Sequence, residues 1–167
     1  MIRQYKNFSE YKLLKSIVLL VAVSILAIPS LVHTQNSYPS EAVVKRVVDG
    51  DTIKLENGER VRYIGVDTPE TKHPYKKVQY FGKEASVFNT KLVEGKKIRL
   101  EYDVEKRDKY GRLLAYVYID DIFVNAELVK QGYARVMTIR PNTRYAEYFK
   151  KLQDQAKEEK KGLWAKK

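Results

Sequence analysis

Three carboxylates beside turn-forming residues are the first candidates for chemistry. Asp51 follows an Asp-Gly dipeptide, and Asp67 and Glu70 flank Pro69. Carboxylates completed by a backbone carbonyl or by water are the ligands that Ca²⁺ and Mg²⁺ prefer, and the sequence offers no His or Cys partner set for zinc. Asp is also common in turns because it hydrogen-bonds the local backbone. Each residue taken alone therefore has this simpler interpretation.

Two arginines have the chemistry to bind phosphate. Arg62 is predicted on the inward face of a strand, where a cation needs a partner or a ligand. Arg112 ends a charged loop over residues 103–112. Guanidinium groups suit phosphate because they offer planar, bidentate donors. An ordinary salt bridge or a solvated charge is the alternative interpretation of each.

A predicted meander of three strands, over 42–48, 52–55 and 60–66, must position these residues. Asp-Gly and Asn-Gly dipeptides between the strands favour two tight turns. The third strand alternates so that Arg62, Ile64 and Val66 share one face. A proline at position 69 prevents that strand from continuing in a sheet. In such a meander the three carboxylates can converge.

The next part of the chain predicts a helix over 82–93 followed by strands over 97–102 and 113–119 and a short strand over 122–124. Together with the meander, this order predicts an α+β fold. Because closure removes most sheet edges, we expect a five-stranded OB-type β-barrel with three α-helices. Barrels of this type often bind oligonucleotides.

Two further helices are expected at the C-terminal end. The first is short, is capped by Asn125 and ends near Gln131. The second is long and charged, over 144–161, and Gly162 ends it. Its i, i+4, i+8 spacing predicts one face formed by Tyr148, Leu152 and Ala156.

Composition favours a folded, basic domain. Of the 167 residues, 44% are hydrophobic, none is cysteine, and the net charge is +11. Disulfides and catalytic thiols are therefore excluded. The first 40 residues carry little of this charge, so the basic excess belongs to the folded part. Such a balance favours a polyanion, which can be nucleic acid, anionic lipid or a wall polymer, although a merely soluble basic surface has the same composition.

The N-terminal segment is predicted to direct export. Residues 1–32 combine a basic start with an apolar run, as in a signal peptide or an uncleaved signal anchor. Both alternatives place the following domain outside the cell, secreted or tethered to the membrane. Residues 33–41 are a polar linker, and the domain spans 42–165.

Several stretches of this domain resemble the thermonuclease family, the micrococcal or staphylococcal-type nucleases. They are collinear from Ala42 to Trp164, and they read VVDGDTIKL at 47–55, VRYIGVDTPETKHP at 61–74, FGKEAS at 81–86, DKYGRLLAYVYI at 108–119, VNAELVKQGYARV at 124–136 and GLW at 162–164. The resemblance implies an OB-type barrel with three helices. It also implies calcium-dependent hydrolysis of DNA and RNA with little sequence specificity, leaving 3′-phosphate ends.

The resemblance assigns roles to particular residues. It implies that Ca²⁺ is held by Asp51, Asp67 and the backbone carbonyl of Thr68. Glu70 would lie near the metal-bound water as general base, and Arg62 and Arg112 would bind the scissile phosphate as catalytic residues. Lys109 and Tyr110 would contact an adjacent phosphate. A monomer without a protein partner is expected.

One departure from the family affects base recognition. The stretch VMTIR at 136–140 lacks the tyrosines that many relatives place there to stack on the base. Stacking is then expected to be weaker or to come from Tyr110 or Tyr145.

Two other functions compete with the nuclease. A non-catalytic binding module has the same barrel, but should lack one or more of the carboxylates and arginines. A basic adhesin for wall polymer or lipid would explain the charge and the export, but not the acidic residues.

Overall fold

The computed structural model of this protein describes residues 38–71 and 79–165. The predicted signal or anchor segment 1–32, the linker up to residue 37 and residues 72–78 lie outside the described residues. Within the described part of the chain, no helix is both long enough and apolar enough to cross a membrane.

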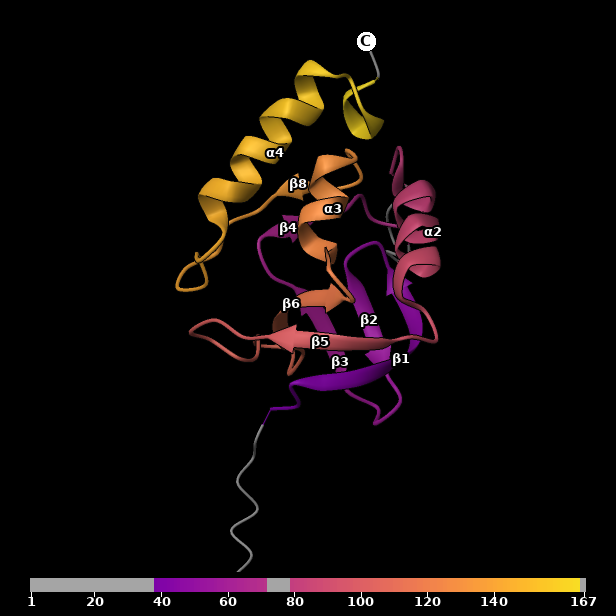
Figure 1. Ribbon diagram of the computed structural model, residues 1–167, viewed down its shortest axis with the longest axis vertical. Coiled ribbons are helices and arrows are strands. Elements are labelled where there is room, and N and C mark those ends of the chain that lie inside the picture. Colours follow the sequence, from indigo (N-terminus) through magenta and orange to yellow (C-terminus); the bar gives the residue numbers. More distant parts are fainter. Residues whose placement is uncertain (1–37, 72–78, 166–167) are drawn as a thin grey trace, which may run out of the picture. The chain divides into compact units, whose positions relative to one another are not determined.

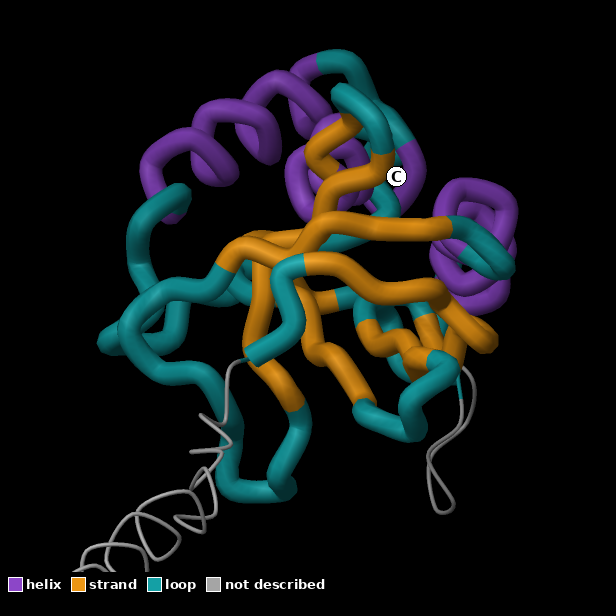
Figure 2. The backbone as a smooth tube through the Cα atoms, turned by 60° about the horizontal axis from the view of Figure 1, so that its bottom comes forward, coloured by secondary structure: helices purple, strands orange, loops and turns teal. Residues whose placement is uncertain are grey.

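Five strands close into a barrel, as predicted. They are β1 (Glu41–Asp49), β2 (Thr52–Leu55), β3 (Arg60–Tyr63), β5 (Lys97–Glu101) and β6 (Leu113–Ile119). Their order is β3-β2-β1-β5-β6, and a parallel pairing between β3 and β6 closes the ring. Figure 2 shows these strands curling round one another with the helices outside them. The predicted turns at Asp-Gly and Asn-Gly join β1 to β2 and β2 to β3.

Shorter elements decorate the barrel. β7 (Ile122–Phe123) forms a hairpin with β6, and β4 (Val66–Asp67) pairs with β8 (Arg135–Val136) in a separate two-stranded sheet. Figure 1 shows the predicted three helices on one side of the strands. They are α2 (Gly82–Val93), α3 (Val124–Lys130) and α4 (Ala146–Glu158), and a 3₁₀ turn, η1 (Gly162–Trp164), follows. α3 packs against α4 and β6, whereas α2 packs against β1.

The alternation of side chains along β2 and β3 builds the barrel interior. Ile53, Leu55, Val61 and Tyr63 are at most 1% exposed, and the residues between them face outward. Burial of such apolar side chains is the main favourable term in folding. The outward positions on these two strands are therefore free to carry polar groups. Arg62 is one of them, so the prediction that it lies on the inward face of its strand is wrong.

The third predicted strand, 60–66, is interrupted, which corrects the expected common face of Arg62, Ile64 and Val66. β3 ends at Tyr63, and Gly65 takes a φ of +80°. A Cβ atom on Gly65 would lie 2.6 Å from the ring of Phe149 in α4. The bend and the close packing of α4 therefore depend on glycine, and they send Val66–Asp67 to β8 instead of along the barrel.

Asn125 does not cap α3, contrary to the prediction. The helix begins at Val124, and no side chain caps it. The buried Asn125 side chain instead accepts a hydrogen bond from the Val117 N–H at 2.9 Å and donates to the Ile64 carbonyl at 2.8 Å. A buried amide must find such partners, and here they tie α3 to β6 and to the bend after β3.

The buried face of α4 also differs from the prediction. The helix spans Ala146–Glu158, shorter than 144–161, and Phe149 lies inside with Leu152 and Ala156. Tyr148 is 48% exposed. The i, i+3, i+7 spacing of the buried residues is the usual apolar stripe of a surface helix, and it places Phe149 against the bend at Gly65.

Asp103, just beyond β5, joins three parts of the domain. Its Oδ2 atom accepts hydrogen bonds from the Tyr116 hydroxyl at 2.9 Å and the Arg144 N–H at 3.1 Å, and its Oδ1 atom accepts one from the Val104 N–H at 3.0 Å. Burial acts to raise the pKa of the Asp103 carboxyl, but the bonds from Arg144 and Tyr116 outweigh it and hold that pKa below its ordinary value.

We predict that Asp103→Asn lowers the free energy of unfolding by about 1–3 kcal/mol at neutral pH, because bonds to a charged acceptor are lost. The Asp103 carboxyl has a lower pKa in the folded than in the unfolded protein, so its ionised form stabilises the fold. The difference in unfolding free energy between the two proteins should therefore be complete above about pH 4, the pKa of an unfolded Asp, and vanish as pH falls through the folded-state pKa. Urea unfolding of both proteins across this range measures it.

The exposed Asp121→Asn is the matched control, expected to change stability by less than about 0.5 kcal/mol. A difference that does not vary with pH would contradict the assignment.

Candidate active site

The turn between β1 and β2 locks Asp51 onto the segment after β4. Asp51 is 5% exposed, and its Oδ2 atom accepts hydrogen bonds from the Thr68 N–H at 2.7 Å and the Thr68 hydroxyl at 3.0 Å. A Cβ atom on Gly50 would lie 2.6 Å from the Thr68 Oγ1 atom. Glycine is therefore required at this turn for the two segments to approach so closely.

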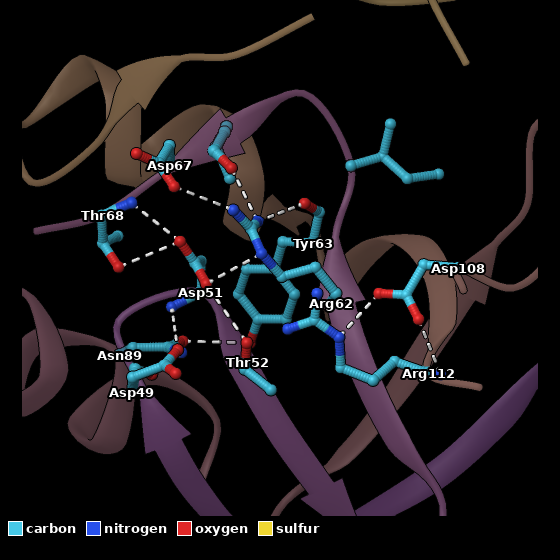
Figure 3. A network of polar contacts seen from close by, with 12 residues as sticks. Asp49, Asp51, Thr52, Arg62, Tyr63, Asp67, Thr68, Asn89, Asp108 and Arg112 are labelled. Carbon is cyan, nitrogen blue, oxygen red and sulfur yellow. Dashed lines mark hydrogen bonds and ion pairs between the residues drawn. The ribbon is translucent and has the colours of Figure 1, made fainter. Parts of the chain in front are cut away.

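Arg62 lies at the centre of the polar network in Figure 3. It projects from β3 opposite Thr52 of β2. Its Nε atom is 3.2 Å from the Asp51 Oδ1 atom, and its Nη2 atom is 3.1 Å from the Asp67 Oδ1 atom. Its Nη1 atom donates to the carbonyls of Tyr63 at 2.8 Å and Val66 at 2.7 Å.

These contacts leave Arg62 little capacity for a ligand. A guanidinium has five N–H donors. Three of them donate to protein oxygens, and Nε also forms an ion pair with Asp51. The side chain is only 10% exposed. Arg62 therefore holds the site together and keeps one Nη2 donor for another group.

Arg112 has the opposite character. Its Nε atom donates to the Asp108 Oδ2 atom at 2.7 Å, and the side chain is 25% exposed. Within the described residues, neither terminal nitrogen of Arg112 has a protein acceptor. The Asp108 pKa lies below its ordinary value because bonds from Arg112 and the backbone outweigh the effect of burial. Asp108 thus orients the Arg112 fork and leaves its two ends available.

Asp51, Asp67, Thr68, Glu70, Arg62 and Arg112 meet around one small polar cavity of about 100 Å³. The carboxylates predicted from the meander do converge, and both predicted arginines join them. The cavity is also lined by Asp49, Thr52 and Pro69. The sequence prediction missed the carboxylate of Asp49, because the Asp-Gly turn alone accounts for an aspartate at that position. The Asp-Gly-Asp spacing, which places a second carboxylate two residues from Asp51, is the pattern that could have indicated it.

Negative charge dominates this cavity. Burial, followed by the nearby Asp51 charge, raises the pKa of the Asp49 carboxyl to about 6. The pKa of Asp67 is also raised, first by burial and then by Asp51, although Arg62 and Arg135 oppose this. The second cause in both cases is repulsion between carboxylates. An added cation would relieve that repulsion.

The donor set of the cavity suits a hard cation. Its anionic atoms are all carboxylate oxygens, and the Thr68 residue lies among them. Oxygen-only sets of this kind suit Ca²⁺ or Mg²⁺. Among residues 38–71 and 79–165, no three acidic, His or Cys side chains form a ready-made metal cluster.

A larger cavity of about 370 Å³ adjoins the first and shares Arg62 and Arg112 with it. The predicted phosphate contacts Lys109 and Tyr110 line it, and Tyr110 is 67% exposed. Part of the wall is apolar and consists of Ile64, Val66, Leu114, Met137 and Ile139. The two cavities together place basic, aromatic and apolar groups beside the carboxylates.

Tyr145, expected as an alternative stacking residue, does not line this cavity. Its hydroxyl donates to Glu101 at 3.0 Å, and its ring packs edge-on against Tyr116 at 4.7 Å. Tyr145 is therefore part of the aromatic packing beneath α4. Of the two proposed stacking residues, only Tyr110 is placed to meet a ligand in the cavity.

Comparison with known proteins identifies the family. A family model described as "Staphylococcal nuclease homologue" matches residues 60–166. Thermonuclease of Staphylococcus intermedius is 46% identical over 125 residues, covering 73% of this chain and 74% of that protein. The chain belongs to the staphylococcal nuclease homologue family.

Two Bacillus subtilis relatives are longer than the matched region. The SPbeta prophage-derived endonuclease YokF is 49% identical over 131 residues, and endonuclease YncB is 49% identical over 126 residues. The match covers 75% and 72% of this chain, but only 44% of YokF and 60% of YncB. Family membership is thus established for the barrel domain.

Proposed function

We propose that this chain is a calcium-dependent phosphodiesterase that hydrolyses DNA and RNA with little sequence specificity and leaves 3′-phosphate ends. The observation that carries the proposal is the convergence of Asp51, Asp67, Glu70, Arg62 and Arg112 on one cavity. The names of the relatives, thermonuclease and endonuclease, support the same reaction class. Neither a binding module nor an adhesin would need this combination of charges.

The arginines supply donors for the scissile phosphate. Attack on a phosphodiester builds negative charge on its nonbridging oxygens, and preorganised donors stabilise that charge. Arg112 offers the two free ends of its fork, which match phosphate in a bidentate way. Arg62 offers its remaining Nη2 donor while it holds Asp51 and Asp67 in place.

The carboxylates provide the cation site. Asp51, Asp67 and the backbone carbonyl of Thr68 would hold Ca²⁺, with water completing the coordination. When bound, the cation neutralises charge that develops on the phosphate. Glu70, on the wall of the same cavity, would accept the proton of the attacking water as general base.

The lining of the larger cavity supports the proposed lack of sequence specificity. Lys109 and Tyr110 would contact a neighbouring phosphate, and the exposed Tyr110 ring can stack on a base of any kind. The side chains of Met137 and Ile139 in the wall of this cavity carry no hydrogen-bonding groups to read a base edge. The amide of Asn142, also in the wall, is bonded to the Glu105 backbone. Binding there would therefore depend on shape and stacking.

The metal requirement can be tested directly. Purified protein should degrade single- and double-stranded DNA and RNA when Ca²⁺ is present and leave them intact in excess chelator, because phosphate cannot approach an unscreened acidic cavity. Gel electrophoresis follows the degradation, and phosphatase sensitivity of the ends identifies 3′-phosphates. DNA that stays intact under both conditions would reject the nuclease and leave the binding module or the adhesin.

Conservative arginine changes should reveal the two roles. Arg112→Lys and Arg62→Lys should each lower kcat by about 10²–10³, the usual cost of losing one preorganised donor. Arg62→Lys should also lower the thermal unfolding temperature, because lysine cannot satisfy two carboxylates and two carbonyls at once. Arg112→Lys should leave it nearly unchanged. The exposed Arg99→Lys on β5 is the matched control, and near-wild-type activity of the Arg62 variant would remove its proposed role.

We also propose that the domain acts outside the cell as a monomer, secreted or tethered through residues 1–32. The basic start and apolar run of that segment support this. Cell fractionation combined with N-terminal sequencing should find the protein in the medium, lacking the segment, or in the membrane with it. Recovery of the intact chain in the cytosol would contradict export.

A further inference from the structure

Three cations lie side by side on the first three strands of the barrel. In the strand register, Arg46 of β1 pairs with Lys54 of β2, and Lys54 pairs with Arg60 of β3. Directly opposed residues on neighbouring strands have Cβ atoms about 5 Å apart. We refer to Arg46, Lys54 and Arg60 as the cation row.

The cation row shares the outer sheet face with the active site. Side chains two residues apart in a strand point the same way, so Lys54 lies on the face of Thr52 and Arg60 on the face of Arg62. The burial pattern agrees, since the intervening Ile53 and Val61 are fully buried in the barrel. Two residues along a strand span about 7 Å. Lys54 and Arg60 of the cation row therefore lie about 7 Å along their strands from Thr52 and Arg62.

No carboxylate neutralises the cation row. Among the described residues, none of the three cations has an ion-pair partner within 4.0 Å. Two acids close to the cation row in sequence or space have other contacts. Glu59 binds Arg107 at 2.8 and 2.9 Å, and Glu94 accepts a hydrogen bond from the Val47 N–H at 2.8 Å. Like charges placed directly opposite destabilise a sheet. A row of three cations therefore lowers the stability of the sheet. Its presence suggests a role other than folding.

We propose that the cation row binds the phosphates of the substrate strand that flank the scissile phosphate, on the barrel side of the active site. The inference rests on the proposed nuclease function, because the strand is aligned by the arginines of the cavity. Backbone phosphates recur at a fixed spacing along a nucleic acid and are read without regard to sequence. The cation row thus lengthens the binding surface without adding base preference.

The binding contribution can be measured apart from cleavage. Every protein in this titration carries Glu70→Gln to suppress hydrolysis, so that binding is measured with Ca²⁺ present. A labelled single-stranded oligonucleotide is titrated with protein, and fluorescence anisotropy gives Kd at several salt concentrations. In the triple variant Arg46→Gln/Lys54→Gln/Arg60→Gln, affinity at low salt should fall about tenfold or more. The slope of log Kd against log salt should become shallower by about 2, because each lost phosphate contact contributes about 0.7. Arg60→Gln alone should change the slope by about 0.7, which keeps the test open if the triple variant fails to fold.

A matched variant removes the same charge elsewhere. Lys130, Lys151 and Lys160 are exposed on and beyond α3 and α4, and Lys130→Gln/Lys151→Gln/Lys160→Gln should keep the wild-type slope. Equal slopes for the wild type and the cation-row variants, or an equal loss in the control, would overturn the proposal. Cleavage by the wild type in Ca²⁺ is scored separately, so failure of the nuclease proposal is distinguishable from failure of the cation row.

Discussion

A buried guanidinium organises the corner of the barrel where the active site lies. Arg62 is almost enclosed, and a cation removed from water destabilises a protein unless oxygen partners surround it. Its partners come from three segments: the turn that carries Asp51, the end of β3, and β4 with Asp67. The same residues form the wall of the acidic cavity, so the requirement to satisfy one charge also shapes the site.

The charges around Arg62 do not balance. Asp49, Asp51, Asp67 and Glu70 face the two arginines across a small cavity. Burial first, and the Asp51 charge second, raise the pKa values of Asp49 and Asp67. Such a cavity repels phosphate until a cation enters. In this account, cation binding and substrate binding are therefore coupled, and the arginines complete the screening once both are present.

The local features of the sequence predicted most of the fold, whereas long-range contacts decided the rest. The Asp-Gly and Asn-Gly turns and the alternation along the strands led to the meander, the barrel and the convergence of the carboxylates. The bend at Gly65 depends on Phe149, which is distant in the chain, and the tether formed by Asn125 depends on Ile64. Neither contact has a local sequence signal. Asp49 was missed for a different reason, since its turn role concealed its place in the cavity.

The central claim is that Asp51, fixed by Arg62 and Thr68, creates a site for one hard cation. Isothermal titration of Ca²⁺ into the purified protein, without nucleic acid, tests it most directly. We predict saturable binding of one ion to the wild type and to the exposed-carboxyl control Asp121→Asn, and loss of that binding in a folded Asp51→Asn. Undiminished binding of one Ca²⁺ by Asp51→Asn would contradict the account.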